Sequence, residues 1–190
     1  MIKTLFISLG LLVALPKADG TLEVKVAEST VNWEGKKVGG GHTGTISIQK
    51  GSLTTEGDKL VGGSFVIDMN TIACTDLEGE YAGKLEGHLK SDDFFGVQKF
   101  PTASFVISKV TPEGGKHKID GTLVIKNIAR EISFPAEVAM ENGKVTATAD
   151  ITVDRSKFDV RYGSGSFFDG LGDKLIYDEF TLSVKLVAAN

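Results

Sequence analysis

The stretch "VTATADITVDR", Val145 to Arg155, indicates the fold class of this protein. Polar and apolar residues alternate along it, and the apolar set is Val145, Ala147, Ala149, Ile151 and Val153. A repeat of two residues is typical of a β-strand with one buried and one solvated face. Arg155 continues the apolar face if the alternation holds, which makes it the exception in this stretch.

The same alternation recurs along most of the chain. It is found in "STVNW" (29–33), "GTISIQ" (44–49), "GGSFVIDM" (62–69), "ASFVIS" (103–108), "GTLVIKN" (121–127), "EISFPAEV" (131–138) and "EFTLSVKLVA" (179–188). Short connections rich in Gly, Asn and Asp separate these runs, as in "PEGGK" and "ENGK", which predicts hairpins and an antiparallel sheet.

Eight or more strands with one apolar face must close into a barrel or stack as a sandwich. Several of the runs have nine or more residues, or about 30 Å at roughly 3.3 Å per residue. Strands of that length favour an all-β, antiparallel eight-stranded barrel, whose interior can be filled by side chains or can hold one small ligand.

One helical insertion interrupts the strands between Asp76 and Val97. Four apolar residues recur at intervals of four, namely Leu77, Tyr81, Leu85 and Leu89, which predicts a helix with a single apolar stripe. Thr75 and Glu78 have the spacing of a capping box. Ser91, followed by Asp92 and Asp93, is typical of the N-cap of a second short turn. We expect this insertion, with Phe94 and Phe95, to cap one end of the barrel.

The first 20 residues have the pattern of a signal peptide. Lys3 precedes an apolar run from Leu5 to Leu15, which is too short to span a bilayer, and small residues follow it. We therefore expect export, with residues 1–20 removed and residues 21–190 forming the mature barrel domain in the periplasm or outside the cell. The alternative is that the apolar run is a buried N-terminal strand or helix.

The charge and the reactive residues exclude several functions. A net charge of −4, without a basic block, argues against nucleic-acid binding. His42, His88 and His117 lack the spacing of metal ligands, and we predict no metal and no cofactor. Cys74 and His88 could act as nucleophile and base, but a lone cysteine is more often a small buried residue, so we predict no catalytic residue.

Arg155 and the Gly-rich segment "GSGSFFDGLGD" (163–173) are two further candidates for the barrel mouth. Arg155 could point into the barrel mouth and hold an anionic or carbonyl headgroup. The favoured alternative is that a bulge changes the register and leaves Arg155 on the surface near Asp154. The Gly-rich segment is predicted to be a long connection, with Phe167 and Phe168 folded back onto apolar surface as a lid.

Several of these segments together resemble the YceI-like family of exported, lipocalin-like polyisoprenoid-binding proteins. The matching stretches are "STVNWEGKKVGGGHTGTI" (29–46), "GGSFVIDMNTI" (62–72), "LEGHLKSDDFFGVQKFPTASF" (85–105), "GTLVIKNIAREISF" (121–134) and "ITVDRSKFDVRYG" (151–163). The resemblance implies an extended barrel with a tunnel for a long isoprenoid chain, and binding without chemistry. It places the segment from His88 to Phe95 near an opening of that tunnel.

We therefore predict a non-enzymatic protein that binds or transports a polyprenyl phosphate or an isoprenoid quinone. The predicted ligand-binding residues are Phe65, Ile67, His88, Phe94, Phe95, Phe105, Ile107, Leu123, Ile125, Phe134, Arg155, Phe158, Leu182 and Val184. Two alternatives stay open: a lipid-modifying enzyme that uses Cys74, His88 and Arg155, and a packed barrel that serves as an interaction module. Transient membrane contact and a homodimer are also left open.

Overall fold

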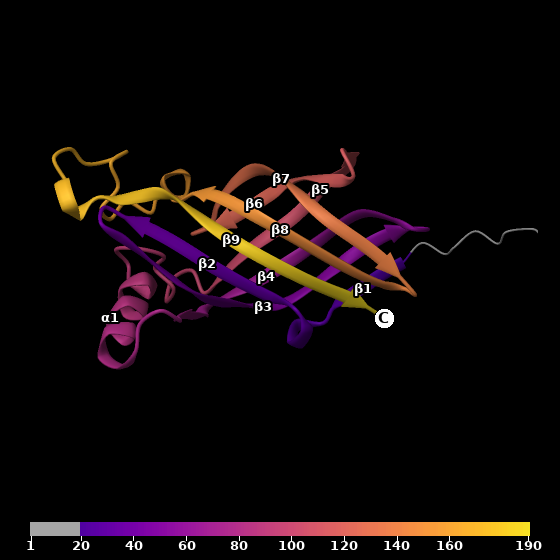
Figure 1. Ribbon diagram of the computed structural model, residues 1–190, viewed down its shortest axis with the longest axis horizontal. Coiled ribbons are helices and arrows are strands. Elements are labelled where there is room, and N and C mark those ends of the chain that lie inside the picture. The colour runs from indigo at the N-terminus through magenta and orange to yellow at the C-terminus, as the bar shows by residue number, and fades with distance from the viewer. Residues whose placement is uncertain (1–19) are drawn as a thin grey trace, which may run out of the picture.

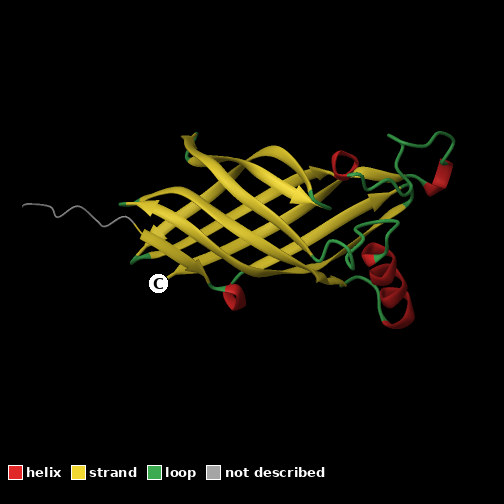
Figure 2. Ribbon diagram, turned by 180° about the vertical axis from the view of Figure 1, so that it is seen from behind, coloured by secondary structure: helices red, strands yellow, loops and turns green. Residues whose placement is uncertain are grey.

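The computed structural model describes residues 20–190, so the predicted signal peptide lies almost wholly outside the described residues. The strands are β1 (Gly20–Val24), β2 (Thr30–Lys37), β3 (Gly40–Glu56), β4 (Lys59–Cys74), β5 (Thr102–Glu113), β6 (Lys116–Ile125), β7 (Ile128–Glu141), β8 (Lys144–Asp154) and β9 (Ile176–Ala189). The α-helix is α1 (Gly79–Lys90), and the 3₁₀ turns are η1 (Val26–Glu28), η2 (Arg155–Phe158) and η3 (Gly172–Lys174). The strands form an elongated barrel with α1 at one end (Figures 1 and 2).

The sheet closes into an eight-stranded antiparallel barrel, as the alternation predicts. The strands from β3 to β9 neighbour one another in an unbroken order, and β2 pairs with both β9 and β3 to complete the ring. The short β1 also pairs with β3 and β9, so it extends β2 in the same position of the barrel. The turn η1 lies between β1 and β2 and separates these two segments, which share one position in the barrel.

The hairpins form where Gly and Asn allow a left-handed backbone. In the turn between β7 and β8, Asn142 has φ 50° and Gly143 has φ 77°. Two successive residues with positive φ are typical of a type I′ turn, whose twist matches that of the flanking strands. The sequence "ENGK" therefore makes this antiparallel pairing, as predicted.

The pairing of β7 with β8 is the shortest part of the ring between long strands. Only residues 137–141 of β7 pair with β8, and their partners are residues 144–148. Beyond it, residues 128–136 of β7 pair with β6, while residues 149–154 of β8 pair with β9. The two strands thus meet at their hairpin and separate toward the end that carries α1 (Figure 1).

Two buried clusters fill the two ends of the barrel. Leu53, Val145 and Ala188 belong to the cluster at the end near β1, and each is at most 1% exposed. Val97, Val153 and Phe158 belong to the cluster at the α1 end, and each is at most 3% exposed. The middle of the barrel lies between these packed ends.

The helical insertion packs at one end of the barrel, but its details differ from the prediction. The helix α1 begins at Gly79, and Glu78 is its N-cap without a side-chain hydrogen bond, so the capping box of Thr75 and Glu78 is wrong. Tyr81, a member of the predicted apolar stripe, is 73% exposed. Ser91 is the C-cap of α1, and its hydroxyl donates to the His88 carbonyl at 2.8 Å.

A short hydrogen-bonded turn does follow Ser91, as predicted, because the Phe94 and Gly96 amides donate to the Ser91 carbonyl at 3.1 and 2.8 Å. The predicted N-cap role of Ser91 is wrong, since its hydroxyl bonds back to His88. Asp92 forms an ion pair with Lys99 at 2.7 Å instead of capping a helix. The segment after α1 turns back toward the barrel through hydrogen bonds from the Phe95 and Val97 amides to the carbonyls of Leu89 and Lys90. This turn brings Phe94 to the barrel end, where it is only 7% exposed.

The Gly-rich segment does not fold back as a lid. Phe167 is 39% exposed and Phe168 is 50% exposed. Ser164 is fully buried and anchors the segment, while the guanidinium of Arg161 lies 5.0 Å from the centroid of the Phe167 ring. The lid prediction is wrong because the buried side chain in this segment is a serine, whereas Phe167 packs on Arg161 and Phe168 stays half exposed beside a hollow at the α1 end.

Candidate ligand-binding cavity

The side chains that point into the middle of the barrel are only partly buried. Phe65 and Ile67 on β4, Phe105 on β5 and Leu182 on β9 face inward yet keep exposed area. In a filled barrel such side chains touch neighbours on every side and lose almost all their exposure. The exposed area instead faces a cavity of about 250 Å³ between the two packed ends.

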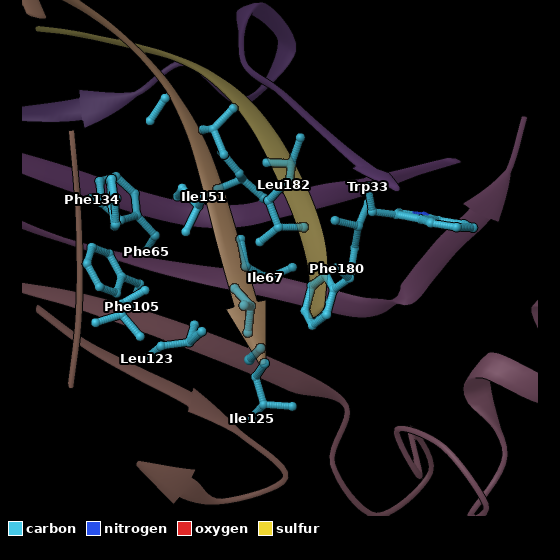
Figure 3. Close-up of a pocket in the computed structure, with 18 of the residues that line it drawn as sticks. Trp33, Phe65, Ile67, Phe105, Leu123, Ile125, Phe134, Ile151, Phe180 and Leu182 are labelled. Carbon is cyan, nitrogen blue, oxygen red and sulfur yellow. The ribbon is translucent and has the colours of Figure 1, made fainter. Parts of the chain in front are cut away.

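The wall of this cavity is apolar. Its side chains come from all eight barrel positions and from the segment after α1, and Figure 3 shows Phe65, Phe105 and Phe134 grouped around the interior with Ile151 and Leu182. The exceptions with polar side-chain atoms are Thr148, Tyr177, Trp33 and Arg155. An apolar space of this kind suits an apolar ligand.

Twelve of the fourteen predicted residues lie in the cavity wall. They are Phe65, Ile67, Phe94, Phe95, Phe105, Ile107, Leu123, Ile125, Phe134, Arg155, Leu182 and Val184. Phe158 instead packs in the buried cluster at the α1 end, where it is 2% exposed. His88 lies outside this wall, in a groove described below.

Several wall residues were not in the predicted set. Trp33, Ile119, Ile132, Ile151 and Phe180 all line the cavity. Each shares the inward face of its strand with a predicted residue or with one of its cross-strand neighbours, as Phe180 does with Leu182. The alternation alone could therefore have identified them.

Glycines on neighbouring strands make room for the aromatic rings. A Cβ at Gly121 would lie 2.4 Å from the Val106 carbonyl oxygen and 2.5 Å from the Phe105 ring. A Cβ at Gly51 would lie 2.7 Å from the Phe65 ring, directly across the strand pair. The rings occupy space that side chains at these two positions would need, and the Phe105 centroid lies 5.6 Å from that of Phe134. Glycine and phenylalanine together thus shape this part of the wall.

Arg155 is buried, and the prediction that it lies on the surface near Asp154 is wrong. It is 2% exposed and begins the turn η2. Its Nε donates to the Tyr177 carbonyl at 3.2 Å, Nη1 to that of Val160 at 2.8 Å and Nη2 to that of Ile176 at 3.0 Å. These contacts use its donors inside the protein at the boundary of the cavity.

Asp178 compensates the buried charge of Arg155. Its Oδ1 lies 3.4 Å from Nη2 of Arg155, and its Oδ2 accepts from the Ser166 hydroxyl at 2.7 Å. Burial raises the pKa of Asp178, but hydrogen bonds from Ser164 and Ser166 and the charge of Arg155 outweigh it and keep the pKa below its usual value. Asp178 is therefore an anion at neutral pH, as a buried guanidinium requires.

A second hollow, of about 870 Å³, lies outside the cavity at the α1 end; we call it the vestibule. It lies between α1, the β2–β3 hairpin and the segment 159–174, and it shares Trp33, Leu89 and Phe94 with the cavity wall. His88 is here, with its ring centroid 4.4 Å from that of Tyr162. The vestibule and the cavity thus share part of one wall at the end of the barrel that carries His88.

The geometry around Cys74 does not resemble an activated nucleophile. Its thiol donates to Oδ1 of Asp76 at 3.2 Å, and Oδ2 of Asp76 lies 3.0 Å from Nδ1 of His42. Burial and the hydrogen bond to Asp76 raise the pKa of the Cys74 thiol. The thiol is thus held protonated, whereas catalysis needs the thiolate.

Within residues 20–190, no group of three or more His, Cys, Asp and Glu side chains is arranged to hold a metal ion. No helix in that part of the chain has the length and apolar character to cross a membrane.

A closed antiparallel barrel of eight long strands around an apolar cavity defines a lipocalin-like binding barrel. The chain belongs to the YceI-like family, since the YceI-like domain matches residues 22–188. A UPF0312 protein of Vibrio vulnificus is 29% identical over 143 residues, covering 68% of this chain and 69% of that protein.

Solved structures share the fold. BcnA of Burkholderia cenocepacia has a TM-score of 0.69 and 26% identity, with 87% of this chain and 99% of BcnA covered. A polyisoprenoid binding domain from Saccharophagus degradans has a TM-score of 0.62 and 12% identity, with 88% of this chain and 97% of that domain covered. A YCEI protein of Campylobacter jejuni has a TM-score of 0.55 and 16% identity, with 100% of this chain and 91% of that protein covered.

Proposed function

We propose that this protein binds and carries a long-chain isoprenoid lipid in its barrel without changing it chemically. The observation that carries the proposal is the apolar cavity inside the barrel. We propose the vestibule, which shares Trp33, Leu89 and Phe94 with the cavity wall, as its entrance. The family membership supports a lipid ligand, and the Saccharophagus degradans neighbour is itself described as a polyisoprenoid binding domain. A polyprenyl phosphate and an isoprenoid quinone both have the required apolar chain.

The size of the cavity favours a chain that extends beyond it. A dry cavity of about 150 Å³ holds benzene, so 250 Å³ holds roughly ten carbon atoms, or about two isoprenoid units. Burial of those carbons contributes about 8 kcal/mol at about 0.8 kcal/mol per CH₂. Micromolar binding needs about 8 kcal/mol after association costs of about 4 kcal/mol or more. A ligand that binds at micromolar concentration must therefore bury more than the roughly ten carbons that fit in 250 Å³.

The chemistry of the reactive side chains favours binding over catalysis. The Cys74 thiol is protonated and hydrogen-bonded to Asp76. The guanidinium of Arg155 donates to three backbone carbonyls, which leaves it less free to polarise a substrate. These contacts argue against the lipid-modifying enzyme, and the cavity argues against a fully packed barrel as an interaction module.

Export, membrane contact and oligomeric state belong to the same proposal. The signal-peptide pattern of residues 1–20 leads us to propose that the mature protein works in the periplasm or outside the cell. There it would exchange lipid through transient contact with a membrane. One chain supplies the whole cavity wall, so we propose that binding does not need a homodimer.

Mass spectrometry of an organic extract tests this function. Protein purified from cells that make isoprenoids should release one such lipid, and the same molecule should be recovered unchanged after prolonged incubation with the protein. A chemically altered lipid would favour the enzyme. Protein that never releases or takes up a lipid would favour the interaction module.

A further inference from the structure

The backbone pairing of the barrel wall is interrupted between β7 and β8, and we call this unpaired part of the wall the window. Its two sides are residues 128–136 of β7 and residues 149–154 of β8, which pair only with their outer neighbours. Six residues of β8 span about 20 Å at roughly 3.3 Å per residue. The window therefore runs along a large part of the barrel.

Both ends of the window are fixed. At the hairpin end, the ladder from Glu137 to Thr148 holds the two strands together. At the α1 end, the Lys126 ammonium donates to the Asp159 carbonyl at 2.8 Å, and Phe158 is buried against the interior. The window is thus a bounded slit and not a frayed end of the sheet.

The residues along both sides of the window are apolar where they face the cavity, and one of them, on β8, has a small side chain. Ile132 and Phe134 of β7 and Ala149 and Ile151 of β8 line both the cavity and these unpaired stretches. Ala149 lacks the bulk to fill the space that a paired strand would close. An apolar chain lying in the window would therefore contact the same surface that lines the cavity.

The free strand edges carry residues that discourage pairing with another strand. Arg130 lies opposite Leu123 and so starts from the inner face of β7, yet its side chain is exposed. Pro135 lies on the same free stretch of β7. Inward-facing charges and prolines are common devices that protect free edges from aggregation. These residues fit a strand edge that stays unpaired.

We propose that the window is a lateral port through which the isoprenoid chain enters and leaves the barrel sideways. This inference rests on the proposed function. A chain longer than about ten carbons exceeds the 250 Å³ cavity, and Ile132, Phe134, Ala149 and Ile151 bring the apolar surface of the cavity to the inner side of the window. A long branched chain that enters through a slit also avoids being threaded lengthwise from the vestibule.

Bridging the window with a reducible crosslink tests the port. Continuing the register of Glu137 with Thr148 places Ser133 opposite Thr152, and both side chains are exposed. In a Cys74→Ser background, the substitutions Ser133→Cys and Thr152→Cys introduce two thiols. A bis-maleimide that contains a disulfide then joins these two thiols across the window. The matched control joins Ala139→Cys and Thr146→Cys, which already pair within the ladder.

The measurement is the rate at which each bridged protein takes up solanesol from vesicles of zwitterionic phospholipid, with geraniol as the short probe. We expect the bridged window to slow solanesol uptake at least tenfold relative to the bridged ladder, and a reductant to restore the rate. Geraniol fits the cavity and should reach it through the vestibule at nearly the same rate in both proteins.

Solanesol uptake within twofold of the bridged ladder would overturn the port and leave the proposed function intact. Failure of the unbridged protein to bind either probe at equilibrium would overturn the proposed function, and the port with it.

Discussion

The guanidinium of Arg155 lies over the ring of Phe94, with its Cζ 5.3 Å from the ring centroid. Phe94 also meets the rings of Phe95 at 5.1 Å and His88 at 5.8 Å. Arg155 is fixed in turn by carbonyls at the start of β9 and by Asp178. This contact joins the end of β8, the start of β9 and the segment after α1 at the boundary between cavity and vestibule.

Replacing Arg155 should therefore destabilise this end of the barrel. Arg155→Met removes three hydrogen bonds of a buried guanidinium and leaves Asp178 as an uncompensated, mostly buried charge. Loss of one partner of such a pair costs about 3–5 kcal/mol. Urea unfolding should show a fall of that size, while Lys157→Met, which removes an exposed charge on the same turn, should change stability by less than about 1 kcal/mol. A loss below about 1 kcal/mol for Arg155→Met would mean that its contacts are not maintained in solution.

Gly121 should not tolerate even a methyl group. In Gly121→Ala, the new Cβ would lie within 2.5 Å of the Val106 carbonyl oxygen and the Phe105 ring. Overpacking of this kind costs about 1–3 kcal/mol, and here the displaced ring belongs to the cavity wall. Thermal unfolding should show a clear loss for Gly121→Ala and little change for the strand control Gly62→Ala, whose Cβ would lie 3.8 Å from its nearest neighbour. Equal melting temperatures for the two variants would contradict the observed packing.

Asp76 should contribute to stability at neutral pH and lose that contribution in acid. A hydrogen bond from the Thr43 amide, with further ones from Cys74 and His42, lowers the pKa of Asp76 to about 2 from an ordinary 3.8. The stabilisation is therefore complete above about pH 4 and disappears as the pH falls toward 2. Urea midpoints should show Asp76→Asn less stable than the wild type near pH 7, with the difference shrinking toward pH 2. A difference independent of pH would show that the charge of Asp76 is not responsible.

Cys74 should be dispensable for function. Cys74→Ser keeps a small side chain that can still donate to Asp76, so we expect a stability change within about 1 kcal/mol and unchanged lipid retention. Extracted lipid per mole of protein is the measurement. A folded Cys74→Ser protein that loses an activity on lipid would support the enzyme alternative.

Strand alternation predicts most of this fold because a sheet with one buried face imposes a period of two on every strand. Inward positions such as Phe65, Ile67 and Leu182 follow from it directly. The placement of Arg155 did not follow, because the strand ends at Asp154 and the next residues form a 3₁₀ turn. Partners for its donors come from Tyr177 and Ile176, more than 20 residues away in sequence, and periodicity carries no information on such contacts.

The gap between β7 and β8 was also beyond the sequence analysis. The segment "EISFPAEV" alternates on both sides of the point where pairing with β8 stops. The alternation of inward and outward side chains is the same in a strand that pairs along one edge as in a strand that pairs along both edges. The proline at position 135 is the one local signal, since it is compatible with a free edge.

Trp33 offers the most direct test of the central claim that the cavity binds an isoprenoid chain. It is the only tryptophan of the chain, and it lines both the cavity and the vestibule. Titration of delipidated protein with polyprenols of increasing chain length should change its fluorescence in a saturable, one-to-one manner, with affinity rising with length until the apolar surface is filled. The matched variant Ala147→Phe, which places a ring in the cavity, should fold and show weaker binding. The absence of a saturable change in the wild type, or equal affinity in Ala147→Phe, would contradict the claim.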